Sequence, residues 1–428
     1  MTLNSGHITG EVGILPSKSH LHRLLIVASL ADKETILQST PTEADDIVAT
    51  IACLEALGAK IRYTNKSNDY SSGEFRVRPI NRDNIPSHAT LPCKESGSTL
   101  RFMLPIVCAL GITGEFHMEG RLPDRPMSPL DRELERAGIS LSRPERKVLR
   151  CEGKLQAGDF SLPGDISSQY ITGLLLALPL LEENSNLTVH EPIESEDYIH
   201  MTLEALETFE QLPTIDQNRY IIQGGEPYLS PSKVFIEGDW SNAAFWLSAG
   251  AMPNGNMQVS GLNPNSRQGD KAICDILQQM GANVQWGNGI VHASEGKRRG
   301  IEIDASAIPD LIPVLSAVAA VSEGTTIIKN AARLRIKESD RLTSTAETLN
   351  LLGANVIEQE DGLEIKGVPK LKGGTVDAWG DHRIAMTAAV ASIACEEPVI
   401  ITGAEAVRKS YPQFWSELTR LGKDLTVK

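Results

Sequence analysis

One short pattern recurs six times along this chain of 428 residues. An amphipathic segment ends on apolar residues, a glycine follows in most copies, and an apolar or β-branched residue comes next. The copies are "LEALGAKI" from Leu54, "LERAGISL" from Leu134, the degenerate "LEALETFE" from Leu203, "LQQMGANV" from Leu277, "LNLLGANV" from Leu349 and "LTRLGKDL" from Leu418. A glycine there favours the left-handed conformation that ends many helices, and a strand would begin after it. The period of about seventy to eighty residues predicts one structural unit used six times.

A second helix recurs at the same period, and it is apolar on nearly every side. Its copies are "RLLIVASLA", "LRFMLPIVCAL", "ITGLLLALPLL", "AAFWLSAGAM", "LIPVLSAVAAV" and "RIAMTAAVASIA". A helix that is apolar all round has to be buried. The chain is too long for one ordinary core. We therefore expect an α/β protein with two domains of three repeats each, in which helices lie inside and sheets outside.

Composition excludes several classes of function. A net charge of −14 argues against a nucleic-acid partner, because phosphate backbones are bound by positive surfaces. The run "ITGLLLALPLL" is too short to span a bilayer, and the N-terminus lacks the regions of a signal peptide. Six cysteines without a CxxC pair indicate neither a zinc site nor a disulfide framework. We expect a cytoplasmic protein with no membrane partner.

Polar residues recur at about seventy-residue intervals in front of the buried helices. They are Lys18, Gly97, Ser167, Asp239, Asp310 and Asp381. Serine, aspartate and glycine are common N-caps, so helix capping is one interpretation of each copy. Anion binding is the other, because helix N-termini carry unpaired N–H groups and a partial positive charge.

Basic residues near these helix starts favour anion binding. They are Lys18, Arg23, Arg125, Lys337, Arg341, Arg383 and Lys409. Two phosphate monoesters and two carboxylates together need about five or six cations. The residues therefore predict a site for two phosphorylated acids. The chain has no GxxxxGK[ST], GxGxxG, HExxH or EF-hand pattern, and its histidines show no metal spacing, so we expect neither nucleotide binding by such loops nor a metal site.

The stretch "RIKESDRL" gathers five charged residues in eight positions from Arg335 to Leu342. It occurs with "PSKSHLHR", "GDISSQY", "IPD", "GDHRIAM" and "RKSYPQFW" in an order and spacing that are specific together. In these motifs the chain resembles the 5-enolpyruvylshikimate-3-phosphate synthase family over nearly its whole length. The resemblance implies two inside-out α/β barrel domains of βαβαββ-like repeats. We place them at residues 17–237 and at residues 1–16 plus 238–428, with the site in the cleft between them.

The resemblance also implies an activity. Members of the family transfer the enolpyruvyl group of phosphoenolpyruvate to the 5-hydroxyl of shikimate 3-phosphate and release phosphate without a cofactor. The expected partners are these two small substrates, and the expected state is a monomer. Glyphosate, a phosphonate with a carboxylate, should compete with phosphoenolpyruvate.

Site residues are carried over from the motifs. Asp310 is the expected base at the hydroxyl, and Lys18 and Glu338 are expected to exchange protons with the enolpyruvyl group and phosphate. The phosphoenolpyruvate residues are Lys18, Gly97, Arg125, Gln169, Arg341, Arg383 and Lys409. The shikimate 3-phosphate residues are Lys18, Ser19, Arg23, Ser167, Ser168, Gln169, Ser195, Tyr198, Asp310 and Lys337. For Asp340, one hypothesis is that it orients Arg341.

Two alternative activities are also compatible with these motifs. The sister enolpyruvyl transferase acting on UDP-N-acetylglucosamine has the same fold and a reactive cysteine in a mobile loop, whereas "HMEGRLPDRPMSP" contains no cysteine. The other alternative is a non-catalytic anion-binding protein built from repeats. Lys18, Asp310 and Glu338 together argue against it, because anion binding alone has little use for two carboxylates.

Overall fold

The computed structural model describes residues 1–4, 6–40, 42–65, 73–287 and 289–422. The chain forms two compact units. Unit 1 is Met1–Ser17 with Glu237–Lys428, and unit 2 is Lys18–Ile236. These boundaries differ by one residue at each crossing from the ranges expected above. The chain therefore leaves unit 1 after its first segment and returns to it after completing unit 2.

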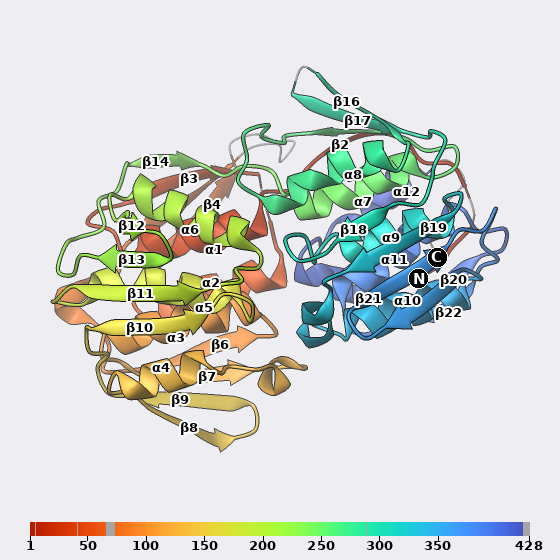
Figure 1. The fold of residues 1–428 in the computed structure, drawn as a ribbon. Coiled ribbons are helices and arrows are strands. Elements are labelled where there is room, and N and C mark those ends of the chain that lie inside the picture. The colour runs from red at the N-terminus through yellow and green to blue at the C-terminus, as the bar shows by residue number, and fades with distance from the viewer. Residues whose placement is uncertain (5, 41, 66–72, 288, 423–428) are drawn as a thin grey trace. The chain divides into compact units, whose positions relative to one another are not determined.

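The described residues of unit 2 form three four-stranded sheets and six α-helices (Figure 1). The sheets have the orders β14-β3-β5-β4, β6-β7-β9-β8 and β10-β11-β13-β12. Their strands are β3 (Thr35–Ser39), β4 (Lys60–Asn65), β5 (Gly73–Arg78), β6 (His88–Lys94), β7 (Thr113–Met118), β8 (Ser140–Glu145), β9 (Val148–Glu152), β10 (Asp159–Pro163), β11 (Ser185–His190), β12 (Thr214–Asp216), β13 (Arg219–Ile222) and β14 (Lys233–Phe235). The helices are α1 (Lys18–Ser29), α2 (Asp45–Ala56), α3 (Gly97–Ala109), α4 (Leu130–Arg136), α5 (Ser168–Ala177) and α6 (Glu196–Thr208).

Unit 1 repeats this plan. Its sheets have the orders β16-β17-β15-β2, β18-β19-β21-β20 and β1-β23-β22. The strands are β1 (Thr2–Leu3), β2 (Thr9–Gly13), β15 (Asn256–Ser260), β16 (Asn283–Gly287), β17 (Ile290–Ser294), β18 (Glu302–Asp304), β19 (Thr325–Lys329), β20 (Asn355–Gln359), β21 (Gly362–Lys366), β22 (Gly374–Asp377) and β23 (Val399–Thr402). The helices are α7 (Trp240–Ala251), α8 (Ile273–Gln279), α9 (Ile312–Ala320), α10 (Arg341–Leu351), α11 (His382–Ser392) and α12 (Phe414–Leu421).

The repeat is a strand, a buried helix, a parallel strand, a second helix and an antiparallel hairpin. The sheet with β10 and β11 illustrates it, because β10 and β11 are parallel and β13 is antiparallel to both β11 and β12. Each unit closes by strands that are distant in sequence: β14 pairs with β3 in unit 2, and β2 pairs with β15 in unit 1. The βαβαββ expectation is confirmed, with the N-terminal β1 serving as the antiparallel partner of β23.

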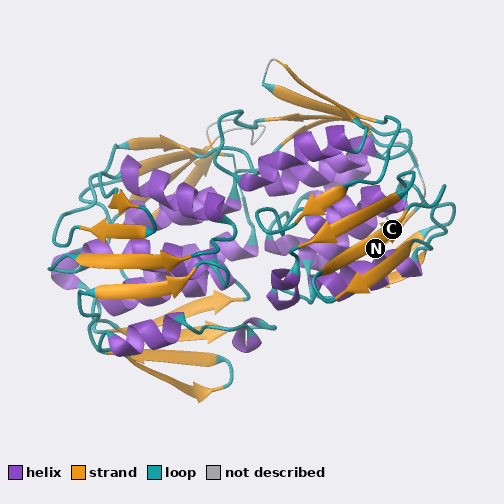
Figure 2. Ribbon diagram, viewed as in Figure 1, coloured by secondary structure: helices purple, strands orange, loops and turns teal. Residues whose placement is uncertain are grey.

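The first helix of each repeat lies in the core, as expected for helices that are apolar all round. In α3, every residue except Ser98 is buried, and in α9 every residue is buried. Figure 2 shows helices grouped together in each unit, with strands alongside them. Each unit has one hydrophobic core made by its own residues. None of the described helices is long and apolar enough to cross a membrane.

The glycine at the end of the second helix is left-handed in four copies. These glycines are Gly58, Gly138, Gly281 and Gly353, with φ between +94° and +105°. In the degenerate copy, Glu210 takes the same role with φ +58°. The expectation is wrong for Gly422, whose φ of −87° is extended because this residue bridges to Ile8. The strand expected after Gly422 lies outside the described residues.

Candidate active site

Arg341 forms the centre of a charged cluster in unit 1. It is the first residue of α10, and its side chain is 1% exposed. Its guanidinium contacts three carboxylates: Nε lies 2.7 Å from Asp381 Oδ2, Nη1 lies 2.7 Å from Asp310 Oδ1, and Nη2 lies 2.8 Å from Glu338 Oε2. Burial opposes the charged form of Arg341, but these carboxylates raise its pKa above the ordinary value. The cluster therefore holds a buried, permanently positive centre.

Asp310 is bound by cations on several sides. It precedes α9 and contacts Arg341, while Arg383 Nη2 lies 3.0 Å from Asp310 Oδ2 and Lys337 Nζ lies 3.9 Å from Oδ1. Burial would raise the pKa of Asp310, but Arg383, Lys337 and Arg341 outweigh it and hold the pKa well below its usual range. Asp310 is therefore a carboxylate, and it becomes a stronger base only when some of these cations are drawn away.

Lys337, Glu338 and Lys409 complete the cluster. Lys409, at the end of a short 3₁₀ helix (Ala404–Lys409), has its Nζ 3.6 Å from Glu338 Oε1. Burial lowers the pKa of Lys337 from 10.5 to about 8, an effect that Arg333 and Arg341 reinforce and that Asp310 and Glu338 oppose. The cluster can thus bind anions and also contains groups that can exchange protons near neutral pH.

Asp340 does not orient Arg341, so that hypothesis is wrong. Its carboxylate caps α10 by accepting from Thr343 N at 3.2 Å, and it pairs with Arg335 Nη1 at 3.0 Å. Asp381 has the orienting role instead. Asp381 also caps α11 by accepting from Arg383 N at 2.9 Å, so one carboxylate serves both as an N-cap and as a counter-ion.

Asp270 is a buried acid that the motifs did not reveal. It lies in a short 3₁₀ helix (Gly269–Ala272), accepts from Ser241 Oγ and is 2% exposed. Its Oδ1 has no partner among the described residues. Burial raises its pKa to about 7, and Asp310 and Asp239 act in the same direction, while Arg383 and the Ser241 hydrogen bond oppose them. The signal was weak because an aspartate in "RQGDKA" looks like an ordinary turn residue.

Lys18 begins α1 in unit 2 and is paired with Asp46. The distance from Lys18 Nζ to Asp46 Oδ2 is 2.7 Å, and the two side chains are 17% and 6% exposed. Asp46 lies in the first turn of α2, where an acidic residue is common for reasons of helix stability alone. The sequence therefore gave no sign that Asp46 would contact a predicted catalytic lysine.

Arg23 is held by neutral groups. Nε donates to Thr202 Oγ1 at 2.8 Å, Nη1 to the Ser19 carbonyl at 2.7 Å, and Nη2 to the Tyr198 carbonyl at 2.9 Å. Arg23 has no carboxylate partner within the ranges that the structure describes. Its Nη2 also reaches Thr172 Oγ1 of α5 at 3.3 Å, so its orientation is determined by α1, α5 and α6, and none of the described carboxylates neutralises its charge.

Gly97 and Arg125 lie in contact at the start of α3. Ser96 caps this helix, and a Cβ added at Gly97 would lie 2.6 Å from Arg125 Nη1 and 3.1 Å from Arg101 Nη1. The Arg125 guanidinium makes no hydrogen bond or ion pair with the described part of the chain, and its Nε is buried. An unpaired cation beside a helix N-terminus is suited to a phosphate.

Gln169 links α5 to this position. Its Oε1 accepts from Arg101 Nη1 at 2.6 Å, and its Nε2 donates to Ser98 Oγ at 2.9 Å. Ser167 caps α5 by accepting from Gln169 N at 3.3 Å, and Ser168 is the first residue of the helix. The start of α5 therefore lies against the start of α3.

Ser195 precedes α6 and has a left-handed backbone with φ +54°. This conformation is uncommon for a residue other than glycine and often marks a functional position. Tyr198, in the first turn of α6, contributes its carbonyl to Arg23. All the predicted residues of unit 2 thus lie at, beside or one turn into the starts of helices α1, α3, α5 and α6.

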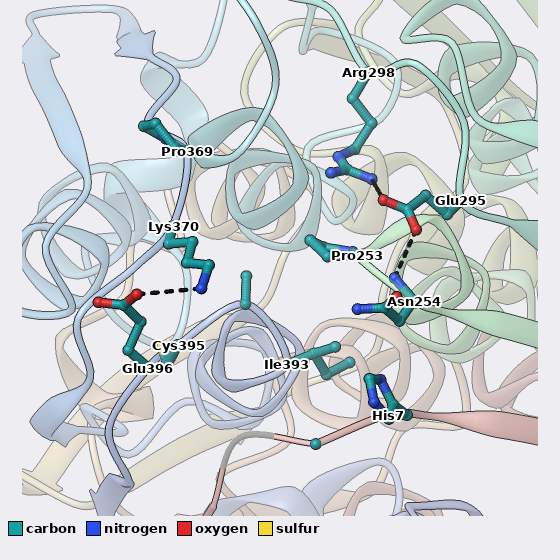
Figure 3. A pocket seen from close by; sticks show the side chains of 12 residues that line it. His7, Pro253, Asn254, Glu295, Arg298, Pro369, Lys370, Ile393, Cys395 and Glu396 are labelled. Atoms are coloured by element: carbon teal, nitrogen blue, oxygen red, sulfur yellow. Dashed lines mark hydrogen bonds and ion pairs between the residues drawn. The ribbon is translucent and has the colours of Figure 1, made fainter.

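A pocket of about 650 Å³ in unit 1 contains none of the predicted residues (Figure 3). It lies beyond the ends of α7 and α11, whereas Asp381 and Arg383 lie at the start of α11. Its charged groups pair with one another: Arg298 Nη1 lies 3.2 Å from Glu295 Oε1, and Lys370 Nζ lies 3.3 Å from Glu396 Oε1. These pairings give no reason to place a polyanionic ligand there.

Comparison with known proteins gives one consistent answer. Residues 3–418 match the family model described as EPSP synthase (3-phosphoshikimate 1-carboxyvinyltransferase). A relative from Clostridium acetobutylicum with that enzyme's name is 43% identical over 426 residues, covering 99% of this chain and 97% of its own. One from Clostridium beijerinckii with the same name is 43% identical over 425 residues, covering 97% of this chain and 96% of its own.

Solved structures agree in fold. EPSP synthase from Acinetobacter baumannii superposes with a TM-score of 0.79 at 24% identity, covering 100% of this chain and 99% of that one. The enolpyruvyl transferase NikO from Streptomyces tendae has a TM-score of 0.77 at 17% identity, covering 98% and 96%. The chain shares the fold of enolpyruvyl transferases. The chain belongs to the EPSP synthase (3-phosphoshikimate 1-carboxyvinyltransferase) family.

Proposed function

We propose that this protein transfers the enolpyruvyl group of phosphoenolpyruvate to the 5-hydroxyl of shikimate 3-phosphate and releases inorganic phosphate, a step of aromatic amino acid biosynthesis. Family membership supports the reaction. The observation that carries the chemistry is the Arg341 cluster, in which two arginines hold Asp310. Arginine is suited to binding a substrate carboxylate through two N–H groups.

The reaction needs an acid, a base and cations. A base takes the proton of the 5-hydroxyl as its oxygen bonds to the substituted carbon of the enol, while an acid protonates the methylene carbon. Loss of a proton from the new methyl group then restores the double bond as phosphate leaves. We assign the base role to Asp310 and the exchange of protons with the enolpyruvyl group to Lys18 and Glu338.

Binding of phosphoenolpyruvate would activate Asp310. In the free protein, Asp310 accepts from N–H groups of Arg341 and Arg383. The carboxylate of phosphoenolpyruvate would compete with Asp310 for these same N–H groups. When the substrate carboxylate takes some of them, the cations that depress the pKa of Asp310 act on it less strongly. Asp310 would then become basic enough to accept the hydroxyl proton once both substrates are bound.

The remaining residues bind the two anions. We assign the phosphate of phosphoenolpyruvate to Gly97, Arg125, Gln169 and Lys409, with Lys18 beside the enol. For shikimate 3-phosphate, we assign the phosphate to Ser167, Ser168 and Ser195, the carboxylate to Ser19 and Arg23, and the ring side to Tyr198, Gln169, Lys337 and Lys18. Two observations on the described residues support these assignments: the Arg125 guanidinium has no partner among them, and Arg23 is held by neutral groups.

We also propose a monomer that acts in the cytoplasm. The six cysteines are all free thiols, and five of them are buried. Unpaired cysteines are usual in a reducing compartment.

A phosphate-release assay tests the function. We expect turnover with phosphoenolpyruvate and shikimate 3-phosphate together, and none with either substrate alone. UDP-N-acetylglucosamine should not replace shikimate 3-phosphate. Release with the sugar nucleotide but not with shikimate 3-phosphate would assign the chain to the sister activity.

A further inference from the structure

His22 of α1 is held by a pair of buried threonines. The distance from His22 Nδ1 to Thr50 Oγ1 is 2.7 Å, and Thr50 Oγ1 lies 2.7 Å from Thr99 Oγ1. Thr50 belongs to α2 and Thr99 to α3, and both are 0% exposed. This pair therefore links three helices through hydroxyl groups inside the core of unit 2.

The Thr50–Thr99 pair leads to two predicted phosphoenolpyruvate residues. Thr99 Oγ1 lies 2.8 Å from Oγ of Ser96, the N-cap directly before Gly97. It also lies 3.4 Å from the Asp46 carbonyl, and the Asp46 carboxylate holds Lys18. The hydroxyl of Thr99 thus connects Ser96, which precedes Gly97, with Asp46, which pairs with Lys18.

The next residue of α1, Arg23, is held by a second pair of buried threonines. Thr172 Oγ1 of α5 and Thr202 Oγ1 of α6 are 2.8 Å apart, and both residues are 0% exposed. Arg23 Nε donates to Thr202 at 2.8 Å, and Nη2 reaches Thr172 at 3.3 Å. With the Ser19 and Tyr198 carbonyls, these contacts use four of the five N–H groups of a guanidinium and leave one of Nη1 for a ligand.

The first pair does not take part in acid–base chemistry. Burial lowers the pKa of His22 to about 3, an effect that Lys18 and Arg23 reinforce and Asp46 opposes. The imidazole is therefore neutral at any working pH, and the two threonine hydroxyls do not ionise. His22, Thr50 and Thr99 can therefore affect the site only by fixing the positions of the groups that they contact.

We propose that the two threonine pairs are positioning residues that serve the two substrates separately. Thr50–Thr99 sets the spacing of Lys18 and the Gly97 loop for phosphoenolpyruvate, and Thr172–Thr202 orients Arg23 for the carboxylate of shikimate 3-phosphate. This inference rests on the proposed function. His22 and Arg23 are adjacent in α1. His22 contacts the threonine pair of α2 and α3, which serves phosphoenolpyruvate, and Arg23 contacts the pair of α5 and α6, which serves shikimate 3-phosphate.

The test exchanges single hydroxyls for methyl groups. In Thr99→Val we expect the KM for phosphoenolpyruvate to rise ~10-fold and that for shikimate 3-phosphate to stay within ~2-fold, which is the size of one lost hydrogen bond to a site group. In Thr202→Val we expect the KM for shikimate 3-phosphate to rise ~10-fold and that for phosphoenolpyruvate to stay within ~2-fold. Equilibrium binding of shikimate 3-phosphate alone should weaken in Thr202→Val and not in Thr99→Val.

Serine variants separate the hydroxyl from packing. Thr99→Ser and Thr202→Ser keep the hydroxyl and should restore each KM to within ~3-fold of the unmodified enzyme, a loss below that of a complete hydrogen bond. Thr348→Val is the matched control, because Thr348 is 1% exposed and its hydroxyl has no partner in the described ranges. The pH profile should not change in any of these variants, since no titrating group is removed.

Two outcomes would overturn the inference, and they are distinguishable. If the unmodified protein shows no turnover with both substrates, the proposed function fails and this assignment fails with it. If turnover is normal but each valine variant raises both KM values equally, or each serine variant is as impaired as its valine counterpart, then the threonines only support packing and the assignment alone fails.

Discussion

The two units contain charged groups at their helix starts, but the surroundings of their predicted site arginines are opposite. In unit 1, Arg341 is surrounded by Asp310, Glu338 and Asp381. In unit 2, Arg23 is held by hydroxyls and carbonyls, and the Arg125 guanidinium has no partner in the described part of the chain. Paired carboxylates allow proton transfer, whereas uncompensated cations favour anion binding. Under the proposed assignments, two of the three proton-transfer residues, Asp310 and Glu338, belong to the paired cluster of unit 1.

The largest expected effect is on stability. Arg341→Gln leaves Asp381 buried at 0% exposure without its guanidinium, and loss of one partner of a buried pair costs ~3–5 kcal/mol. Arg23→Gln leaves only neutral acceptors without a donor, so it should lower the free energy of unfolding by ~1–3 kcal/mol. Urea unfolding of both variants measures this difference. Equal losses would remove the contrast between the two units.

The next effect concerns turnover. Glu338→Gln keeps the shape of the side chain but removes its ability to exchange a proton, so kcat should fall by ~10²–10⁴-fold with both KM values within ~3-fold. Asp46→Asn in unit 2 removes the carboxylate that pairs with Lys18 and should lower kcat less. Glu358→Gln, which loosens the exposed pair with Arg335, is the control and should leave kcat unchanged. An unaffected kcat in Glu338→Gln would make Glu338 structural.

A smaller effect is expected at the binding side of unit 2. Gly97→Ala would place a Cβ 2.6 Å from Arg125 Nη1, so this guanidinium must move. The KM for phosphoenolpyruvate should rise ~10-fold, the size of one weakened charge-assisted contact. The inhibition constant of glyphosate, a longer molecule, should rise by a larger factor.

Steady-state inhibition of both proteins by glyphosate tests this. Gly287→Ala is the control, because a Cβ there meets nothing within 4 Å. Equal factors for the substrate and the inhibitor, or inhibition that is not competitive with phosphoenolpyruvate, would show that Gly97 does not line this site.

The smallest expected effect is a pH dependence of shikimate 3-phosphate binding that arises from Lys337 in unit 1. Burial lowers the pKa of Lys337 to about 8, so its positive charge is lost as the pH rises from 7 to 9. Binding of shikimate 3-phosphate, whose phosphate is already ionised in this range, should weaken severalfold. In Lys337→Arg the cation stays charged, and the rise in KM above pH 8 should disappear. A pH profile that is the same in both proteins would separate Lys337 from substrate binding.

The sequence was informative wherever a local property decides the outcome. Helix burial follows from an apolar surface on every side, and the helix ends at Gly58 and Gly353 follow from the conformational freedom of glycine. The motif "RIKESDRL" located Lys337 and Glu338 in the segment before α10 and Arg341 at its first residue. These features depend on neighbours within a few residues, so a single chain suffices to predict them.

Long-range pairing decided the rest. Asp381 rather than Asp340 orients Arg341, and the two residues are 40 positions apart. Asp46 pairs with Lys18 over a separation of 28 residues. Thr202 accepts from Arg23 over a separation of 179 residues. Even Gly422 departs from the other glycines because Ile8 pairs with it. Caps, counter-ions and buried hydroxyls are ordinary residues in the sequence, and they acquire a role only when packing brings a distant partner within hydrogen-bond distance. The sequence by itself therefore determined the repeated architecture and the residues at its helix starts, whereas the tertiary structure decided which of those charges are neutralised, because electrostatic partnership depends on distance in space and not along the chain.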